Sequence, residues 1–302
     1  MVRRVPRRHG SDKPRGNFYN ALRALVRWSG TAAGASALLV AAVHAQTPSP
    51  LQEWQYSGGV VLQKLFMPEL PEWRVMVGPA VIYKPLYEGA DLTRTQAGPL
   101  INIRYKDIWF ASVGEGLGIN LLSGRNYRAG LALTYDLGRL ESNDISHLRG
   151  LGDIKEAPAI KAFASYAVSK SFPLVLRGDV RQFAGGADGM VADISAYMPL
   201  PGSSKRLAMF AGPSFTYADH LFMQKEFGVS QTQSIDSGYP VYDAHAGSNA
   251  IGLGFSATGF ITEHWLINLD AAVDHLLGSA ASSPITQQVT QHVLIVSLAY
   301  SW

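Results

Sequence analysis

The 302-residue sequence contains no cysteine, which excludes a disulfide framework, a thiolate metal site and a cysteine nucleophile. Charged residues are also scarce, at 16 % of the chain against about 25 % in ordinary soluble domains. No run of 18 apolar residues follows residue 43, so no transmembrane helix is predicted there. What the chain does contain is 47 % hydrophobic and 10 % aromatic residues, a composition that argues against disorder.

The net charge of +3 has its source at the N-terminus. Residues 1–45 hold eight of the 26 basic residues and one of the 23 acidic residues, so the remainder carries 18 basic and 22 acidic residues. A basic stretch ends near Trp28, and the apolar run 30–43 leads to small residues before Gln46. This order describes a secretory signal peptide, and its run of 14 residues is too short to span a bilayer. We predict a signal peptide over 1–45 with cleavage after Ala45, and no nucleic-acid partner.

The rest of the chain shows a period-two alternation of apolar and polar side chains. The clearest case is 125–139, where Tyr127, Leu131 and Leu133 share one face and Arg128 and Asp136 share the other. The alternation predicts about twelve strands, with ten or fourteen also compatible. They lie at roughly 54–66, 73–83, 98–106, 107–121, 125–139, 158–170, 172–183, 188–199, 205–218, 250–262, 265–273 and 289–302.

The character of the polar faces decides between a soluble β-sandwich and a membrane barrel. These faces carry Gly, Ala, Ser, Thr and scattered Arg and Asp, whereas water-facing strands of soluble proteins carry dense Lys and Glu. Aromatic residues gather near strand ends, and the chain ends on Trp302 in a strand of the right phase. We therefore predict that residues 46–302 form an all-β fold, a single antiparallel transmembrane β-barrel in the outer membrane of a Gram-negative bacterium, in contact with lipid and lipopolysaccharide.

Loop lengths test the strand count, because bacterial outer-membrane barrels have short periplasmic turns and longer outer loops. With twelve strands the long links 140–157, 219–249 and 277–288 all fall outside. One pair disagrees: the link 84–97 is long yet periplasmic, and the turn 105–107 is short yet external. Either the first strand is misassigned, or the 84–97 loop has a role on the periplasmic face.

No catalytic, cofactor or metal constellation is apparent. The six histidines after residue 45 lie on separate segments without ligand spacing, and no Gly-x-Ser-x-Gly motif occurs. Gly114, Gly116 and Gly118 alternate within a predicted strand, where small residues leave room for a bulky neighbour or a bend. We predict a protein that is not an enzyme and that binds no cofactor.

Charged residues on the predicted inward faces offer two interpretations. They are Arg128, Lys161, Arg177, Asp179, Arg181, Asp193, Asp270 and Asp274. Mixed charges can cross-link a barrel interior through charge-assisted hydrogen bonds or line an open polar channel. We favour the interior network, and the loop 219–249 could also fold in as a plug.

An ordered series of motifs resembles the MipA/OmpV family of outer-membrane proteins. It begins with Tyr-Lys-Pro-Leu-Tyr-Glu-Gly-Ala-Asp at 83–91 and continues with Gly-Leu-Gly-Ile-Asn at 116–120 and Leu-Arg-Gly-Leu-Gly at 148–152. Phe-Gly-Val-Ser at 227–230 follows, and the similarity extends over about 54–302. Ala90 departs from the family, which usually has Ser there, and Phe227 stands where an aromatic pair is common.

The resemblance implies a non-catalytic scaffold that links a lytic murein transglycosylase to a bifunctional murein synthase. On this basis we predict that five residues shape a partner loop: Tyr83, Pro85, Tyr87, Glu88 and Asp91. The simpler interpretation is that Pro85 merely sets a turn and Glu88 is solvated. The alternative functions are an outer-membrane diffusion channel or small-solute transporter, and a surface adhesin that uses the aromatic residues of loop 219–249.

Overall fold

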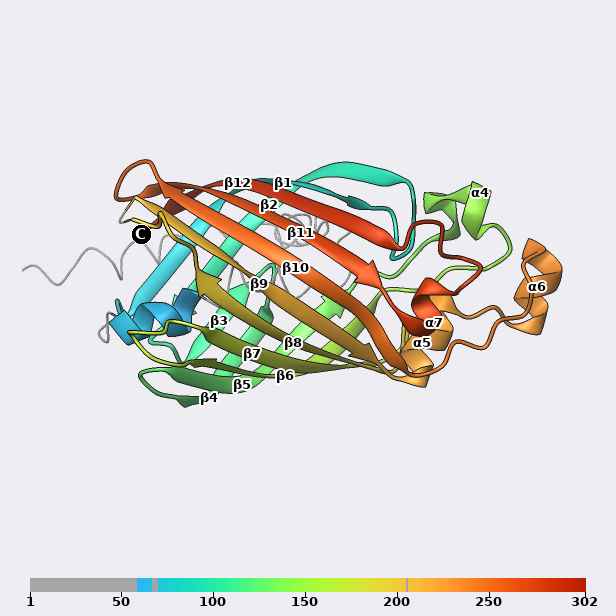
Figure 1. The fold of residues 1–302 in the computed structure, drawn as a ribbon, viewed down its shortest axis with the longest axis horizontal. Coiled ribbons are helices and arrows are strands. Elements are labelled where there is room, and N and C mark those ends of the chain that lie inside the picture. Colours follow the sequence, from blue (N-terminus) through green and yellow to red (C-terminus); the bar gives the residue numbers. More distant parts are fainter. Residues whose placement is uncertain (1–58, 67–69, 205) are drawn as a thin grey trace, which may run out of the picture. The chain divides into compact units, whose positions relative to one another are not determined.

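The computed structural model describes residues 59–66, 70–204 and 206–302, and these form a closed barrel of twelve antiparallel strands (Figure 1). Each strand pairs with its neighbours in sequence, and β1 closes the barrel against β12, from Met76 opposite Ser301 to Tyr83 opposite Leu294. The strands are β1 Trp73–Pro85, β2 Thr93–Tyr105, β3 Trp109–Ser112, β4 Gly116–Ser123, β5 Tyr127–Asp136, β6 Ala157–Ala167, β7 Val175–Phe183, β8 Met190–Pro199, β9 Leu207–Ala218, β10 Gly247–Phe260, β11 Trp265–Leu276 and β12 Thr290–Ser301. The predicted fold class and strand number are confirmed.

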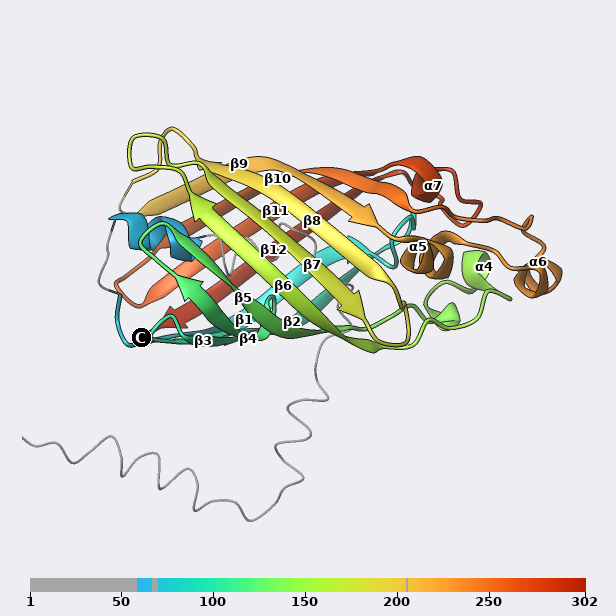
Figure 2. The same ribbon diagram turned by 90° about the horizontal axis from the view of Figure 1, so that it is seen from below.

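The two ends of the barrel differ in the length of their connections. One end, here called the turn end, carries the short links 106–108, 124–126, 168–174, 200–206 and 261–264. The other, the cap end, carries longer segments with η1 (Glu141–Asn143), α4 (Ile145–Leu148), α5 (His220–Phe227), α6 (Gln231–Ser237) and α7 (Gly278–Ala281). These helices gather at one extremity in Figure 1 and again in Figure 2. By the usual rule for such barrels, the turn end faces the periplasm.

The alternation of side chains has the orientation that a membrane barrel requires. Along β6 every second residue is buried and the others are exposed. On β5, Leu131 and Leu133 point outward, whereas Arg128 and Asp136 are buried inside. All eight predicted inward charges lie inside the barrel, with Asp274 half-buried and the other seven buried. An apolar outer face and a polar interior place the barrel in the outer membrane.

Aromatic side chains form a belt near each end. At the turn end the rings of Trp73 and Tyr105 lie 4.6 Å apart, and Tyr300 packs edge-on against Trp302 at 4.7 Å. Exposed tyrosines mark the cap side, at Tyr83, Tyr135 and Tyr217. Such belts occur where the bilayer meets water, because the rings combine an apolar body with a polar edge.

Two strand assignments made from the sequence are wrong. Residues 59–66 of the predicted first strand are helical, and the predicted strand 107–121 is a hairpin of β3 and β4 joined by the turn 113–115. The two errors cancel, so the total of twelve is correct, while the predicted links 84–97 and 105–107 change side. The link 86–92 therefore lies at the cap end, where the three long links also lie, and 106–108 is a turn-end link. The misassigned first strand explains the disagreement in loop lengths.

The β3–β4 hairpin is shorter than its neighbours. β2 pairs with β1 along its whole length but with β3 only over Asn102 to Tyr105, so the hairpin covers only the half of the wall near the turn end. Gly118 of β4 faces the ring of Phe110, where a Cβ would lie 2.3 Å from the ring. This confirms the prediction that small residues here make room for a bulky neighbour.

Among the described residues, no helix has both the length and the apolar character needed to cross a membrane. The predicted leader, the cleavage after Ala45 and residues 54–58 of the predicted first strand lie outside the described residues.

Candidate functional site

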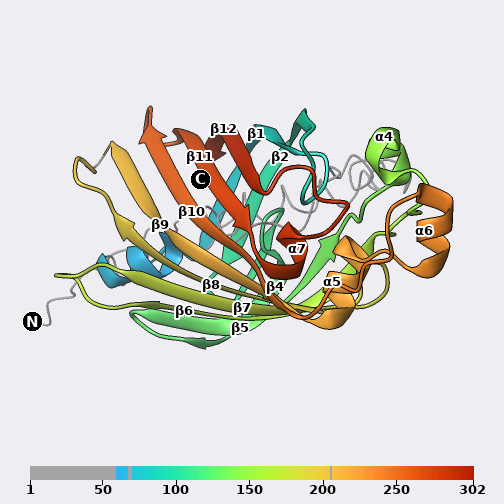
Figure 3. The same cartoon turned by 45° about the vertical axis from the view of Figure 1, so that its right-hand side comes forward.

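The turn end is occupied by the helix over residues 59–66, drawn in blue in Figure 3. Its apolar side chains Val61, Leu62 and Leu65 are all buried, and Val61 is only 1 % exposed. They pack in one cluster with inward-facing residues from four strands of the wall: Ala167, Val175, Tyr197 and Ala272. Because these partners come from β6, β7, β8 and β11, the helix lies against the inside of the barrel at this end.

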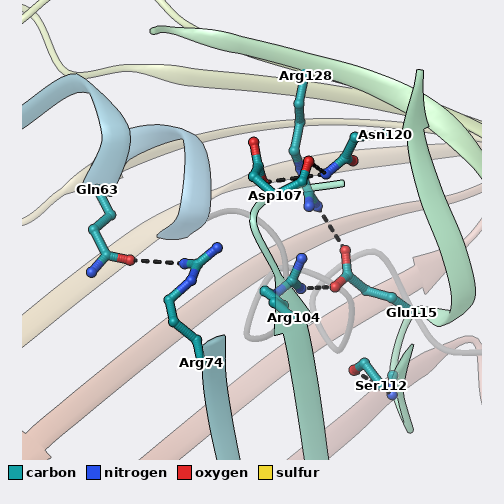
Figure 4. A network of polar contacts seen from close by, with 9 residues as sticks. Gln63, Arg74, Arg104, Asp107, Ser112, Glu115, Asn120 and Arg128 are labelled. Carbon is teal, nitrogen blue, oxygen red and sulfur yellow. Dashed lines mark hydrogen bonds and ion pairs between the residues drawn. The ribbon is translucent and has the colours of Figure 1, made fainter. Parts of the chain in front are cut away.

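Polar contacts fix the opposite side of this helix. Lys64 Nζ donates to Asp107 Oδ2 at 2.7 Å and to Ser123 Oγ at 2.6 Å. Arg74 of β1 donates to Gln63 Oε1 at 3.2 Å, a contact visible in Figure 4. Asp107 itself accepts from Asn120 Nδ2, so the helix is tied both to the β2–β3 link and to strand β4.

Farther inside, Glu115 lies between two arginines (Figure 4). The β3–β4 turn carries this carboxylate into the lumen, where it pairs with Arg104 and accepts from Arg128 at 2.7 Å. All three side chains are buried, and the Arg128 guanidinium lies 5.2 Å from the ring centroid of Phe163. Paired charges of this kind cross-link neighbouring parts of the wall, here β2, β5 and the β3–β4 hairpin between them.

A second buried network lies on β7, β8 and β9. Asp193 pairs with Arg181 and accepts from Thr216 Oγ1 at 2.5 Å. Arg177 and Asp179 join it at 3.4 Å. Five of the eight inward charges predicted from the sequence thus belong to these two ion-pair networks. The predicted charge-assisted contacts inside the barrel are therefore present.

The cap end is closed by the interstrand segments. Phe222, Met223 and Phe227 of α5 are buried against the wall residues Phe183 and Leu276, together with other residues of the same cluster. Asp219 caps α5 by accepting from Phe222 N, and Ser230 and Gln233 form a reciprocal capping box at the start of α6. The wall residues Phe183 and Leu276 belong to β7 and β11, which lie on either side of the β9–β10 pair that the segment 219–246 connects. α5 therefore lies over this opening of the barrel as a cap.

The structure brings four of the five predicted loop residues into this cap. Tyr87 is 1 % exposed and packs with Leu148 and Val229, while Arg139 lies 5.7 Å from its ring centroid. Pro85 is buried at the end of β1, and Asp91 is exposed beside α4. Tyr83 differs, because it points outward and belongs to the aromatic belt.

Glu88 is not a solvated loop residue. It is half-buried, and its Oε1 accepts from Asn249 Nδ2 at 2.7 Å. Burial and the nearby Glu226 carboxylate raise the pKa of Glu88 to about 8, and burial likewise raises the pKa of Glu226 to about 7. The two acids line a polar cavity of about 130 Å³ between the cap and the lumen, together with Lys84, Arg139 and Asp274.

Metal-compatible groupings occur only at the cap end among the described residues. Asp91, Asp144 and His147 form one, and His220, Asp243 and His245 form the other. No single motif in the sequence places either set together, because each joins residues from different loops or from both ends of one loop. The helix over 59–66 is not predicted from the sequence, and its buried residues are Val60, Val61, Leu62 and Leu65.

Comparison with known families decides the classification. The sequence profile of the family described as MltA-interacting protein MipA matches residues 77–302. The chain belongs to the MipA family. No curated protein sequence matches the chain.

Several solved outer-membrane structures are similar to this MipA-family protein at low sequence identity and low TM-score. The CymD monoaromatic hydrocarbon channel is 7 % identical, with a TM-score of 0.41 over 85 % of this chain and 98 % of that one. The Pseudomonas putida toluene transporter TodX is 10 % identical, with a TM-score of 0.36 over 86 % and 96 %. The outer membrane protein OprD from Pseudomonas aeruginosa is 11 % identical, with a TM-score of 0.35 over 78 % and 66 %.

Proposed function

We propose that this MipA-family barrel is a non-catalytic outer-membrane scaffold that holds murein-processing enzymes at its periplasmic turn end. The observation that carries the proposal is the occupied lumen. A helix lies inside the turn end, two buried ion-pair networks line the inner wall, and α5 packs over the cap end. A barrel filled in this way is suited to presenting surfaces rather than to passing solutes. The family's printed name, MltA-interacting protein, supports a protein partner.

The turn end is the better candidate for the partner surface. It carries the short links, the helix over 59–66 and exposed charges such as the Glu72–Lys106 pair, whose atoms lie 3.0 Å apart. The loop 86–92 lies at the opposite end, and Tyr87 and Glu88 there hold the cap together. We therefore propose that Tyr87, Glu88 and Pro85 shape the cap and do not contact the partners. The partners that we propose are a lytic murein transglycosylase and a bifunctional murein synthase. Lipid and lipopolysaccharide would contact the apolar outer face of the barrel.

A second candidate function, passage of a small polar solute, rests on the cavity beside Glu88. Its lining mixes cationic and acidic groups, as a solute-conducting lumen does. Single-channel recording in a planar bilayer separates the two functions. A scaffold with a filled lumen is silent, whereas a channel shows conductance steps without any change to the helix over 59–66.

The direct test is a crosslinked pull-down of the tagged barrel from intact outer membranes, followed by mass spectrometry. The double variant Glu72→Lys/Lys106→Glu alters the turn-end surface, and Asp236→Lys on the exposed face of α6 is the matched cap-end control. We expect murein enzymes with the wild type and with Asp236→Lys, and at least a severalfold loss with the double variant. Recovery of the barrel alone from wild-type membranes would overturn the scaffold.

A further inference from the structure

Two histidines and an aspartate meet at the neck of the segment 219–246, which joins β9 to β10. His220 is the first residue of α5, and Asp243 and His245 lie just before β10 begins at Gly247. His220 Nε2 is 4.0 Å from Asp243 Oδ1, and His245 Nδ1 is 3.7 Å from Asp243 Oδ2. One ligand atom from each of the three residues lies within 4.8 Å of the other two.

The hydrogen bonding of His220 directs its free nitrogen toward this cluster. Its Nδ1 lies 3.0 Å from the carbonyl oxygen of Ala244, which can only accept, so Nδ1 carries the hydrogen. In the neutral ring Nε2 therefore presents its lone pair to the side where Asp243 lies. Histidines that bind metals are held in the same way, by a carbonyl or carboxylate on the other ring nitrogen. The backbone of His245 is also anchored, because its N–H donates to Ser279 Oγ at 3.1 Å.

The spacing and accessibility suit a metal ion that keeps an open position. Metal–nitrogen and metal–oxygen bonds of about 2.0–2.1 Å place tetrahedral ligands about 3.3 Å apart, so small side-chain movements would close the cluster on an ion. The side chains of His220, Asp243 and His245 are 54 %, 67 % and 76 % exposed, which leaves a path for the ion and for a water ligand. Two imidazoles and one carboxylate form a donor set that suits zinc and related divalent transition metals.

We propose that His220, Asp243 and His245 bind a divalent transition-metal ion, zinc being the best match, and that the ion clamps the neck of the cap. It would join residues at the two ends of the segment that carries α5 and α6, much as a cross-link closes a loop. The ion reduces the opening of α5 and α6 away from the barrel. The site is independent of the scaffold proposal, because it lies at the opposite end of the barrel from the proposed partner surface.

The second cluster has less need of an ion. His147 Nδ1 is already 2.8 Å from Asp144 Oδ2, and Ser146 Oγ is 2.5 Å from Asp144 Oδ1. Both oxygens of Asp144 are therefore engaged in short contacts within the loop. His147→Ala is consequently a useful comparison, since it removes a cap-end histidine that the proposed site does not use.

The test uses the barrel purified from outer membranes in detergent, stripped with chelator and carrying no polyhistidine tag. Zinc chloride is titrated by calorimetry into the wild type, His245→Ala, Asp243→Asn, His147→Ala and the turn-end control His264→Gln. We expect one zinc per barrel, at least tenfold weaker binding in the first two variants, and unchanged binding in the last two. Absence of binding, equal binding in all proteins, or loss only in His147→Ala would overturn the proposal.

Limited proteolysis provides a second readout that does not depend on the calorimetric signal. Zinc should slow cleavage within 219–246 in the wild type and in His264→Gln, but not in His245→Ala. All three ligands are exposed, so the variants should retain the heat-modifiable electrophoretic mobility of a folded barrel. Zinc protection of 219–246 that persists in His245→Ala would count against the clamp.

Discussion

The turn end is closed by one helix inserted into the barrel, whereas the cap end is closed by the loops that connect the strands. The helix over 59–66 relies on three apolar side chains, Val61, Leu62 and Leu65, with polar ties at its edge. The cap combines an apolar cluster under α5 with hydrogen-bonded acids such as Glu88. Closure of the turn end therefore depends on burial of apolar surface. Closure of the cap end depends also on the protonation of its carboxyl groups.

Between these two ends, Glu115 stabilises the barrel wall itself. Its replacement should therefore cause the largest loss in the free energy of unfolding. Glu115→Ala leaves Arg104 and Arg128 buried without their carboxylate, a loss expected to cost about 3–5 kcal/mol in the free energy of unfolding. Urea unfolding of the barrel in detergent measures this. Glu263→Ala in an exposed turn-end link is the control and should behave as wild type. A change below about 1 kcal/mol would show that the network contributes little.

A charge on the buried face of the helix should open the turn end. In Val61→Asp a carboxylate would replace a side chain packed among Val175, Ala167 and Tyr197, and desolvation of that charge should expel the helix. We expect conductance steps in a planar bilayer, where the wild type is silent. Gln63→Asp places the same carboxylate on the exposed face of the same helix and should remain silent. If both variants conduct, or if both are silent, burial of the apolar face of the helix does not close the turn end.

The cap should respond to pH, and the turn end should not. Because the pKa of Glu88 is raised to about 8 in the folded protein, the folded state holds a proton that the unfolded chain releases above about pH 4.5. Its stabilising contribution is therefore complete below that pH and is lost as pH rises toward 8. Hydrogen exchange of 219–246 should be slower at pH 5 than at pH 8 after correction for the intrinsic rates.

The variant Glu88→Gln sharpens this comparison. A neutral amide cannot ionise, so we expect the pH dependence of cap protection to become shallower, although the ionisation of Glu226 leaves part of it. Asp236→Asn on the exposed side of α6 is the matched control and should retain the full dependence. A wild-type pH profile in Glu88→Gln would show that Glu88 is not responsible.

The smallest effect is expected at the surface of the turn end. The side chains of Lys106 and Glu72 are 42 % and 69 % exposed, and ion pairs between such groups contribute little to stability. Lys106→Ala should therefore leave the urea midpoint unchanged while it weakens capture of partners. A shift in the midpoint would indicate that this pair supports the barrel rather than a binding surface.

The barrel could be predicted from the sequence because its signal repeats in every strand. On β5 the outward Leu131 and Leu133 alternate with the inward Arg128 and Asp136, and no tertiary information is needed to see this. The wrong strand predictions lie in short segments whose hydrophobic pattern does not identify the secondary structure. The apolar residues between 59 and 66 fit a strand or a helix equally, since a run of this length does not resolve the two periods. The pattern around Glu115 also predicts a strand, although Gly116 has a φ of +87° and ends a turn.

The candidate sites were beyond prediction for a different reason. Glu88 and Asn249 are separated by 161 positions, and His220 meets His245 only because the neck of the cap closes. Such contacts depend on the order of strands around the barrel and on how the loops fold over it. The motif at 83–91 was recognised, but the misassigned first strand placed it on the wrong side of the membrane.

The most direct test of the account is photo-crosslinking from single positions at the two ends, in living cells. A photoreactive residue replaces the exposed Glu263 at the turn end in one variant and Asp236 at the cap end in the other. The account predicts that murein enzymes are captured from position 263 and not from position 236. Capture from position 236 alone, or from neither position while the barrel is present in the outer membrane, would contradict it.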